Sequence, residues 1–474
     1  MKKFQWCFLF ILVFTGTISS QSWWDVGTAG FSPGGAVYPA MAIDSVGTPH
    51  VVFKDLVHSG KATVMKYNGT MWEIVGAPGF SAGEAEFTSI AVDRLGNPYV
   101  VYMDAVNSYK ATVMKYNGII WETVGTAGFS ISTAYYTSIA IDQNNIPFVG
   151  YVDYGNSRKA TVMRFNGVNW ETVGSAGFTD GIVDKTAISL DQNGFPYIVF
   201  IDAANSQKAT VMYYDALNWQ TLGVAGFSDE PIDYPSIFID RNGVTYVAYA
   251  EGILEKKATV RMRGSSWETL GSPRFSEGYI RYTSIAVSKD GTPFIAFWEG
   301  DYFTYKGRAL KFNGGGWEYL ESSDSVFSST QADYTNIVIS PSGIPVVSYV
   351  DVYNSNRVTV KQFSANQGDP LPVEENTITP SDFSLYQNYP NPFNPSTRIQ
   401  YAIGSLPTGQ AGRQFVQLRV YDVLGNEVAT LVNEEKPSGI YNVQFTMNNL
   451  SSGVYLYKII AGGFVQTKKM ILIR

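Results

Sequence analysis

The stretch that decides the fold is Lys110–Asp153, KATVMKYNGIIWETVGTAGFSISTAYYTSIAIDQNNIPFVGYVD. It is one copy of a unit that recurs seven times, and each copy carries a tryptophan in a WETVG-like run. A constant period of this length, built from short strand-like runs, is typical of a β-propeller or another radial array. The tryptophans used to count the units, with spacings of 48, 49, 49, 49, 48 and 50 residues, are Trp24, Trp72, Trp121, Trp170, Trp219, Trp267 and Trp317.

Each unit contains four short runs of alternating apolar and polar residues. In the unit that follows Trp121 these runs are WETVG, Thr137–Asp142, Pro147–Asp153 and Lys159–Gly167. The turn Asp93–Pro98 joins two such runs, with an aspartate that can accept backbone N–H groups and a glycine suited to positive φ. Four alternating strands with tight turns predict one antiparallel meander, which is one propeller blade.

The two ends of the repeat predict how the ring closes. The first ordered run, Trp23–Gly27, is the strand type that finishes a unit, whereas the last unit ends at Arg357–Phe363 without such a strand. We therefore expect the N-terminal strand to complete the last blade, which removes two free sheet edges. The sequence predicts an all-β fold with a seven-bladed β-propeller over residues 22–364. A β-solenoid of the same period is the structural alternative, but it would not need split ends.

The N-terminus and the composition predict the compartment. Two lysines, the apolar run Trp6–Phe14 and small residues before Gln21 make residues 1–20 a predicted signal peptide. The only cysteine, Cys7, lies in this segment, so we expect no disulfide and no cysteine-based site in the mature chain. No later apolar stretch is long enough for a transmembrane helix. The net charge of −7 argues against nucleic acid as a partner.

The pattern stops after Phe363. Residues 365–382 lie in a polar stretch with three prolines that is typical of a linker. Alternating runs then predict a small Ig-like β-sandwich of six or seven strands over residues 383–474. The predicted strands are Thr397–Ile403, Phe415–Asp422, Glu427–Val432, Ile440–Thr446, Val454–Ala461 and Val465–Ile473.

Several motifs in this last region occur in a recognisable order. They are YPNPFNPST (Tyr389–Thr397), YDVLGNEV (Tyr421–Val428), SGIY (Ser438–Tyr441), SGVYLYKI (Ser452–Ile459) and the basic end KKMILIR. The region resembles the type A C-terminal sorting domain of the type IX secretion system of Bacteroidota. The resemblance implies export through the periplasm to the medium or the outer-membrane surface, with the secretion machinery as a partner of residues 383–474. The alternative is an ordinary Ig-like module.

One face of the predicted propeller carries recurring groups that could bind a ligand. The loop into the first strand and the loop between the second and third strands emerge on that face. An aromatic residue precedes the first strand in six units, and Lys185 takes its place in the other: Tyr38, Phe87, Tyr136, Tyr234, Tyr282 and Tyr334. An acidic residue ends the second strand of every unit. It is Glu251 or Glu299 in two units and an aspartate in the other five: Asp55, Asp104, Asp153, Asp202 and Asp351. Asparagines follow in four units: Asn107, Asn156, Asn205 and Asn354.

Two interpretations of these groups remain open. Each acid is followed six residues later by a lysine or arginine in most units, as in Asp104 and Lys110, which would form an exposed salt bridge worth about 0–1 kcal/mol. Alternatively, the aromatic, acid and asparagine form repeated pockets for sugars, and weak repeated sites would gain from multivalency. Calcium at the turn aspartates is disfavoured, because each turn offers one carboxylate and calcium takes six to eight oxygens.

The sequence offers little sign of catalysis. The only histidines, His50 and His58, lie in the first unit, and no nucleophile elbow, HExxH motif or P-loop is present. We expect His58 to be a solvated loop residue, and we expect no cofactor and no metal site. The predicted function is a secreted or surface-displayed, non-enzymatic protein that binds glycans or proteins. A hydrolase or lyase, marked by non-repeated charged residues at the centre of one face, and a structural or adhesive role are the alternatives.

Overall fold

The computed structural model describes residues 21–301, 304–320, 326–364, 383–386, 388, 391–404, 413–446 and 450–473. The described chain forms two compact units, residues 21–364 and residues 383–473. The predicted signal peptide and linker lie outside the described residues, and the predicted domain limits stay a prediction. Among the described residues, no helix is long and apolar enough to cross a membrane.

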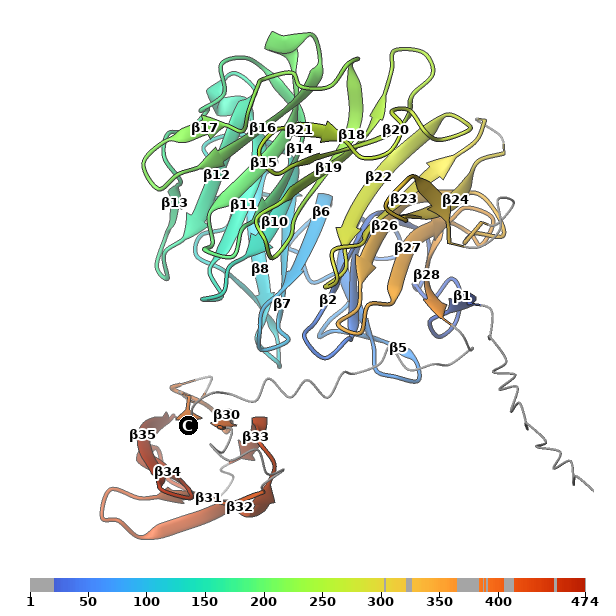
Figure 1. The fold of residues 1–474 in the computed structure, drawn as a ribbon. Helices are drawn as coiled ribbons and strands as arrows, with labels where there is room; N and C mark the ends of the chain where they lie inside the picture. Colours follow the sequence, from blue (N-terminus) through green and yellow to red (C-terminus); the bar gives the residue numbers. More distant parts are fainter. Residues whose placement is uncertain are drawn as a thin grey trace, which may run out of the picture. The chain divides into compact units, whose positions relative to one another are not determined.

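The first unit consists of seven four-stranded antiparallel sheets, six of them formed by four consecutive strands and the seventh by β26–β28 with β1, which confirms the seven-bladed propeller (Figure 1). Blade 1 contains β2 (Ala36–Ile43), β3 (Pro49–Asp55), β4 (Lys61–Tyr67) and β5 (Trp72–Ile74). Blade 2 contains β6 (Ala85–Val92), β7 (Pro98–Asp104), β8 (Lys110–Tyr116) and β9 (Trp121–Thr123). Blade 3 contains β10 (Ala134–Ile141), β11 (Pro147–Asp153), β12 (Lys159–Phe165) and β13 (Trp170–Thr172). Blade 4 contains β14 (Val183–Leu190), β15 (Pro196–Asp202), β16 (Lys208–Tyr214) and β17 (Trp219–Thr221). Blade 5 contains β18 (Ile232–Ile239), β19 (Thr245–Glu251), β20 (Lys257–Arg263) and β21 (Trp267–Thr269). Blade 6 contains β22 (Ile280–Val287), β23 (Pro293–Glu299), β24 (Lys306–Phe312) and β25 (Trp317–Tyr319).

Blade 7 closes the ring as predicted. Strands β26 (Ala332–Ile339), β27 (Pro345–Asp351) and β28 (Arg357–Ser364) are completed by the N-terminal strand β1 (Ser22–Asp25), which pairs with β28. The register corrects one detail of the repeat. Trp23 lies opposite Phe363, as Trp72 lies opposite Tyr67 in blade 1, so Trp23 and not Trp24 is the repeat tryptophan.

The repeat tryptophans join neighbouring blades, as their regular spacing suggests. The indole N–H of Trp121 donates a hydrogen bond of 2.7 Å to the Val75 carbonyl of the preceding blade. Its ring stacks on Phe80 from the loop between the two blades, with 3.8 Å between ring centroids. Gly76 has φ of +73°, and a Cβ there would lie 3.0 Å from the Trp121 ring. Packing of the tryptophan against the preceding blade therefore explains why each WETVG-like run begins with tryptophan and ends with glycine.

The turns between the first and second strands are capped by their own aspartates in blades 1 to 5, and Ser288 and Ser340 take that place in blades 6 and 7. Asp93 Oδ1 accepts hydrogen bonds from the backbone N–H groups of Leu95 and Asn97, at 2.9 and 2.8 Å. Asp44, in the equivalent turn of blade 1, accepts from Val46 and Thr48 in the same way. These carboxylates are thus used inside the turns, which agrees with the predicted capping role.

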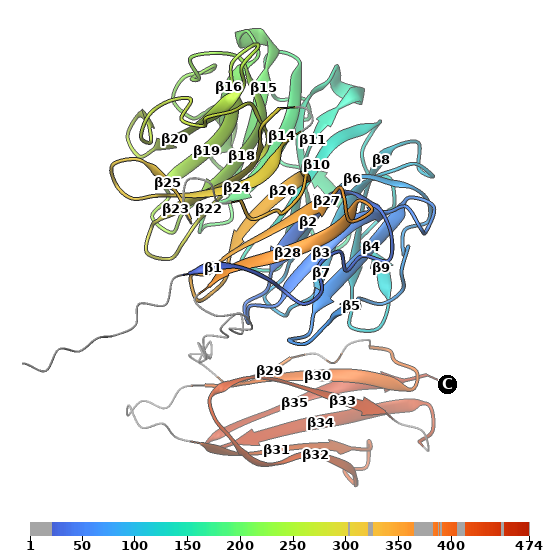
Figure 2. The same cartoon turned by 90° about the vertical axis from the view of Figure 1, so that its right-hand side faces the viewer.

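The second unit is a β-sandwich of seven strands in two sheets (Figure 2). One sheet is β29 (Ser384–Leu385), β30 (Ser396–Ile403) and β33 (Gly439–Thr446); the other is β32 (Glu427–Lys436), β31 (Gln414–Tyr421), β34 (Gly453–Ala461) and β35 (Phe464–Leu472). Ile399 and Tyr401 from the first sheet and Leu418 and Ile459 from the second share one buried core. All six predicted strands are present, and the short β29 is the seventh.

Candidate functional site

The first strand of every blade contains an irregularity at its start. In blade 3 the pairing of β10 with β11 shifts between Tyr135 and Ser138, and Tyr136 lies at this bulge with φ of +51°. A left-handed backbone costs about 1–2 kcal/mol for a residue with a side chain, so seven repeated instances indicate a feature that the fold maintains. The residues in this conformation, with φ between +40° and +53°, are Tyr38, Phe87, Tyr136, Lys185, Tyr234, Tyr282 and Tyr334. The predicted aromatic positions therefore lie within the first strands and not before them.

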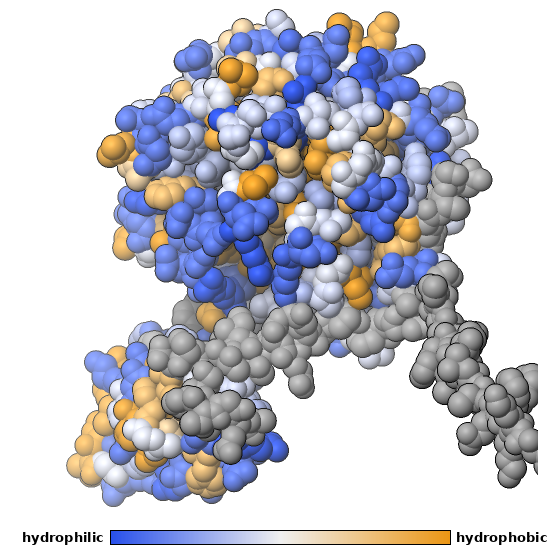
Figure 3. Space-filling view, in the orientation of Figure 1, coloured by the Kyte–Doolittle hydropathy of each residue, from blue (hydrophilic) through white to orange (hydrophobic). Residues whose placement is uncertain are grey.

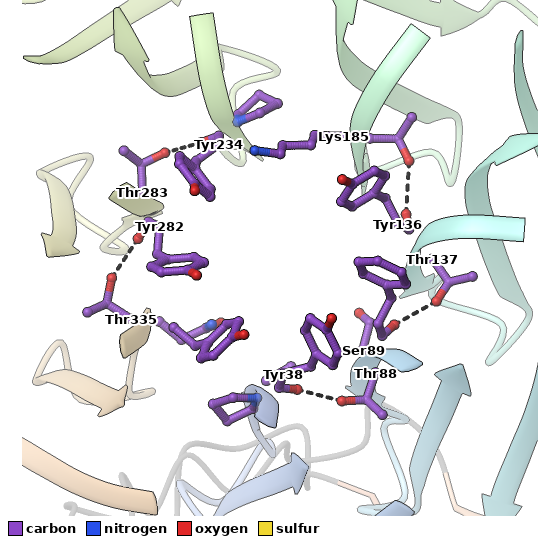
Figure 4. A pocket seen from close by; sticks show the side chains of 17 residues that line it. Tyr38, Thr88, Ser89, Tyr136, Thr137, Lys185, Tyr234, Tyr282, Thr283 and Thr335 are labelled. Carbon is purple, nitrogen blue, oxygen red and sulfur yellow. Dashed lines mark hydrogen bonds between the residues drawn. The ribbon is translucent and has the colours of Figure 1, made fainter. Parts of the chain in front are cut away.

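These seven side chains converge on the axis of the propeller, where they line one open cavity of about 300 Å³ (Figure 4). Neighbouring rings touch in sequence around the axis. The ring centroids of Phe87 and Tyr136 are 4.7 Å apart, and those of Tyr282 and Tyr334 are also 4.7 Å apart. Tyr38 connects the two groups, at 4.9 Å from Phe87 and 5.5 Å from Tyr334. We call this set of six aromatic residues and Lys185 the axial ring.

Threonine hydroxyls hold the backbone of the axial ring in place. Thr137 Oγ1 donates a hydrogen bond of 2.7 Å to the Phe87 carbonyl of the neighbouring blade, and Thr186 donates one of 3.0 Å to the Tyr136 carbonyl (Figure 4). The same bond recurs at five of the seven blade junctions: Thr88, Thr137, Thr186, Thr283 and Thr335 are the donors. Pro39 and Pro235 occupy the cavity lining at the two remaining positions. The blades therefore fix the ring positions jointly.

The tyrosine hydroxyls of the axial ring are poor acids. Burial raises the pKa of Tyr38 to about 12, with further contributions from Glu86 and from the neighbouring Tyr334. Burial likewise raises the pKa of Tyr136 to about 12, and raises the pKa of Tyr282 still further. At neutral pH these groups are protonated and can donate or accept hydrogen bonds, whereas none of them is suited to remove a proton from a substrate.

Charged residues that do not follow the repeat lie next to the axial ring in the first strands, and the sequence interpretation missed them. They occupy the position immediately before the axial ring in five of the seven first strands, where Val37 and Tyr135 stand in the other two: Glu86, Asp184, Asp233, Arg281 and Asp333. Asp233 forms ion pairs with both Lys185 and Lys256, and Glu86 forms one with Lys54. The Lys185 ammonium also lies 3.8 Å from the centroid of the Tyr234 ring. Aligning the units on the aromatic position would have revealed this variable column.

The predicted acids and asparagines have a different environment. Register pairs place Ala134, Asp153 and Lys159 at the same end of a blade, which confirms that both loops emerge on one face. Asp104 is 1% exposed, and its oxygens accept hydrogen bonds from Val106 N, Asn107 Nδ2 and Thr112 Oγ1 at 2.8–3.1 Å.

The same arrangement recurs, and we call each instance a loop clamp. Asp153 accepts hydrogen bonds from Asn156 and Thr161, both at 2.8 Å. Asp202 accepts hydrogen bonds from Asn205 and Thr210, at 2.9 and 2.7 Å. Asp55 accepts from Thr63 at 2.8 Å, and Asp351 is buried and accepts from Thr330. Because the carboxylates are buried and accept hydrogen bonds from groups of the same blade or of the segment that leads into it, the clamps explain the repetition of these residues. Their predicted role in ligand binding stays a prediction.

The two histidines lie outside the cavity lining. His58 is not simply solvated, because its Nδ1 lies 2.7 Å from the buried carboxylate of Asp55. His50 is 3% exposed on β3, with Nε2 3.5 Å from Asp44. Among the described residues, no group of three or more His, Cys, Asp or Glu side chains could hold a metal ion.

The family comparison concerns the second unit. Residues 387–473 match the family described as the secretion system C-terminal sorting domain. The chain carries a type IX sorting domain. The protein is therefore exported to the extracellular space or the cell surface, and residues 387–473 link it to the secretion machinery. No curated protein sequence matches this chain.

Solved structures resemble the whole chain or its propeller at low sequence identity. A polysaccharide lyase of family PL25, an ulvan lyase bound to -[GlcA(1-4)Rha3S]-, has a TM-score of 0.50 and 12% identity over 72% of this chain and 96% of the lyase. A second structure of a PL25 ulvan lyase has a TM-score of 0.50 and 11% identity over 72% of this chain and 96% of the lyase. PorZ, a surface component of the type-IX secretion system of Porphyromonas gingivalis, has a TM-score of 0.38 and 13% identity over 92% of this chain and 70% of PorZ. At these identities the likeness concerns the propeller fold alone.

Proposed function

We propose that the propeller is a secreted carbohydrate-binding module with one site, the axial ring and the mouth of its cavity. The observation that carries this proposal is the convergence of six aromatic side chains on one open cavity, each from a strained backbone position. Aromatic faces present flat apolar surfaces to the C–H faces of sugar rings, and the tyrosine hydroxyls add hydrogen-bonding groups. The seven-fold repeat thus serves a single site on the axis, in contrast to a set of peripheral pockets.

Several features favour binding over catalysis. The tyrosines of the axial ring are protonated at neutral pH because burial raises their pKa. Lys185 and Lys256 are both engaged in ion pairs with Asp233. Both histidines lie outside the residues that line the cavity. The tyrosines, the paired lysines and the two histidines are therefore groups that can recognise a ligand and are not placed as a general base at the cavity.

A polysaccharide lyase or hydrolase is the second candidate function. The observation in its favour is the set of non-repeated charged residues next to the axial ring, the feature expected of an active site on a symmetric scaffold. The fold likeness to an ulvan lyase adds that a propeller of this kind can act on an acidic polysaccharide. The fold by itself does not assign the activity, because one fold supports many functions.

A binding experiment tests the proposal. The mature protein, without residues 1–20, would be applied to a glycan array, and its hits would be measured by calorimetry. We expect binding to at least one class of glycan and a loss of about tenfold or more in the Tyr282→Gly variant. Asp180→Gly, at an exposed site, is the control and should bind as the unmodified protein does.

Two results would contradict the proposal. Absence of binding to every glycan, or binding that Tyr282→Gly leaves unchanged, would remove the axial ring from consideration. Steady release of unsaturated or reducing ends from a polysaccharide such as ulvan would favour the lyase or hydrolase instead. Export is tested separately: a chain lacking residues 383–474 should accumulate in the periplasm, and its normal appearance in the medium would contradict the sorting role.

A further inference from the structure

Blade 6 departs from the repeat at the edge of the axial cavity. Arg281 stands directly before Tyr282 of the axial ring, and its cross-strand neighbour is Trp298. In other blades the residues opposite this position are smaller or unbranched, such as Met103 and Val152. Tyr279 and Tyr305 also approach Trp298. One blade therefore places an arginine and three large aromatic residues beside Tyr282 of the axial ring.

These residues are packed together around the guanidinium group. The Arg281 guanidinium lies 5.6 Å from the centroid of the Tyr279 ring and 5.6 Å from that of Trp298. Tyr305 stacks on Trp298 with 4.1 Å between centroids and an angle of 29° between the ring planes. Trp298 is only 3% exposed, so the platform is part of the blade and does not depend on a surface loop side chain. Cation–π contacts of this kind hold an arginine in place.

Arg281 differs in its ion pairing from the lysines near the axial ring. Lys54 pairs with Glu84 and Glu86, while Lys185 and Lys256 pair with Asp233. Within the described part of the chain, Arg281 forms no such ion pair, and its buried Nε has no hydrogen-bond partner. It nevertheless lies close to the axial ring: burial and Asp233 raise the pKa of Tyr234, and the positive charge of Arg281 opposes that rise.

An acid and a hydroxyl complete the surroundings of Arg281. Asp333, from the first strand of blade 7, carries a carboxyl whose Oδ2 lies 3.5 Å from the Tyr305 hydroxyl. Burial raises the pKa of Asp333, whereas Tyr305 and the positive charge of Arg281 oppose this shift. The surroundings of Tyr282 thus contain one guanidinium without an ion-pair partner, one carboxyl and a packed aromatic platform. A guanidinium is suited to hold a planar or tetrahedral oxyanion through two parallel hydrogen bonds.

We propose that Arg281, with the platform of Trp298, Tyr279 and Tyr305, is an acidic-sugar subsite that binds a uronate carboxylate or a sulfate ester. The inference rests on the proposed carbohydrate-binding function and specifies the class of ligand. In this arrangement Arg281 neutralises the anionic group, Asp333 accepts a hydrogen bond from a sugar hydroxyl, and the axial ring binds the neighbouring sugar face. The specificity therefore comes from the one blade that breaks the repeat, whereas the axial ring supplies general affinity for sugars.

The test compares anionic glycans with matched neutral ones. The mature full chain would be titrated with oligogalacturonate and its methyl ester, and with a sulfated carrageenan oligosaccharide and its desulfated form. We expect preference for at least one anionic member of these pairs. Arg281→Met should lower affinity for that member about tenfold or more, with less than a twofold effect on its neutral counterpart. Arg281→Lys keeps the charge without the planar fork and should give an intermediate loss, which also guards against misfolding of the methionine variant.

Arg241→Met is the matched control, because Arg241 is exposed in the turn at the opposite end of blade 5 and should leave all affinities unchanged. Equal losses for anionic and neutral sugars in Arg281→Met, or no preference for anions in the unmodified protein, would overturn the acidic-sugar subsite. In that case binding that is still abolished by Tyr282→Gly would leave the proposed function intact. If Tyr282→Gly has no effect on any glycan, both proposals fail.

Discussion

The loop clamps and the axial ring lie on the same face of the same blades, and both recur around the propeller. In the clamp, Asp104 is buried and is bound by Thr112, Asn107 and a backbone N–H. In the axial ring, Tyr136 lies in a costly left-handed conformation and directs its ring into an open cavity. The first group satisfies its polar atoms within the chain, whereas the second holds strain and faces open space.

The difference teaches how to interpret repetition in this protein. A repeated residue whose hydrogen bonds are completed within its own loop is explained by folding. A repeated residue held at a cost, with its side chain half-buried against a cavity, asks for a further explanation. The propeller surface in Figure 3 mixes hydrophilic and hydrophobic residues over the visible face, so exposure alone does not single out a site there.

The largest effect on stability is expected from breaking a loop clamp. Asp104→Ala leaves the hydroxyl of Thr112 and the amide of Asn107 without their shared acceptor and should lower the free energy of unfolding by about 3 kcal/mol. Urea or thermal unfolding would measure the loss, with Asp180→Ala at an exposed site as the control. Glycan affinity of the folded variant should stay within twofold, and a selective loss of affinity would assign the clamps to ligand binding.

The largest effect on binding is expected from removing an aromatic of the axial ring. Tyr136→Gly relieves the left-handed strain at φ of +51° while it removes the ring contact with Phe87. These effects offset each other, so the free energy of unfolding should change by less than about 1 kcal/mol. Glycan affinity should fall about tenfold or more. Tyr136→Phe, which retains the ring, is the comparison variant; retained affinity in the glycine variant would argue against the axial ring.

A moderate effect is expected from the threonine bonds that position the axial ring. Thr137→Val has the same shape but loses the hydroxyl that donates to the Phe87 carbonyl at 2.7 Å. Loss of one largely buried hydrogen bond should cost about 1 kcal/mol of stability. Because the Phe87 backbone is then less fixed, affinity should fall about two- to threefold. Calorimetry with the same glycan would measure this; an unchanged affinity would show that the ring does not need this support.

The smallest effect, and the one with a pH signature, concerns Asp333. Burial raises its pKa above the unfolded value of 3.8, so the folded protein loses stability as pH rises and the carboxyl ionises. Asp333→Asn should therefore raise the melting temperature at pH 7 by a few degrees at most, and the difference should vanish well below pH 3.8. Thermal unfolding across pH would show this. A variant that is less stable at pH 7 would mean that the ion interaction with Arg281 outweighs burial.

The architecture was predictable from the sequence because its causes are local and repeated. Period, turn chemistry and the split strand at the ends specify seven blades and their closure, since each blade follows the same rules of burial and capping. The sequence interpretation chose Trp24 as the repeat tryptophan, whereas the structure shows that it is Trp23. Two adjacent tryptophans fit the spacing equally well, and only the register with β28 distinguishes them. The sorting domain was predictable from its motifs.

The site was predictable only in part. The six aromatic positions were identified from their repetition, but their place inside a bulge depends on strand register, which the spacing does not reveal. Arg281 and Asp333 were missed because they belong to different blades and do not repeat. They come together when the consecutive blades 6 and 7 pack and bring β22 beside β26. Non-local pairs of this kind have no periodic signal in one sequence.

The central claim is that the ligand binds on the axis and not in the peripheral loops. The most direct measurement is a crystal structure of the mature protein with its tightest-binding oligosaccharide. We predict sugar density at the mouth of the cavity, in contact with at least two rings of the axial ring, including Tyr282. Sugar density beside Asp104 and Asn107, with the axial cavity holding only water, would contradict the account.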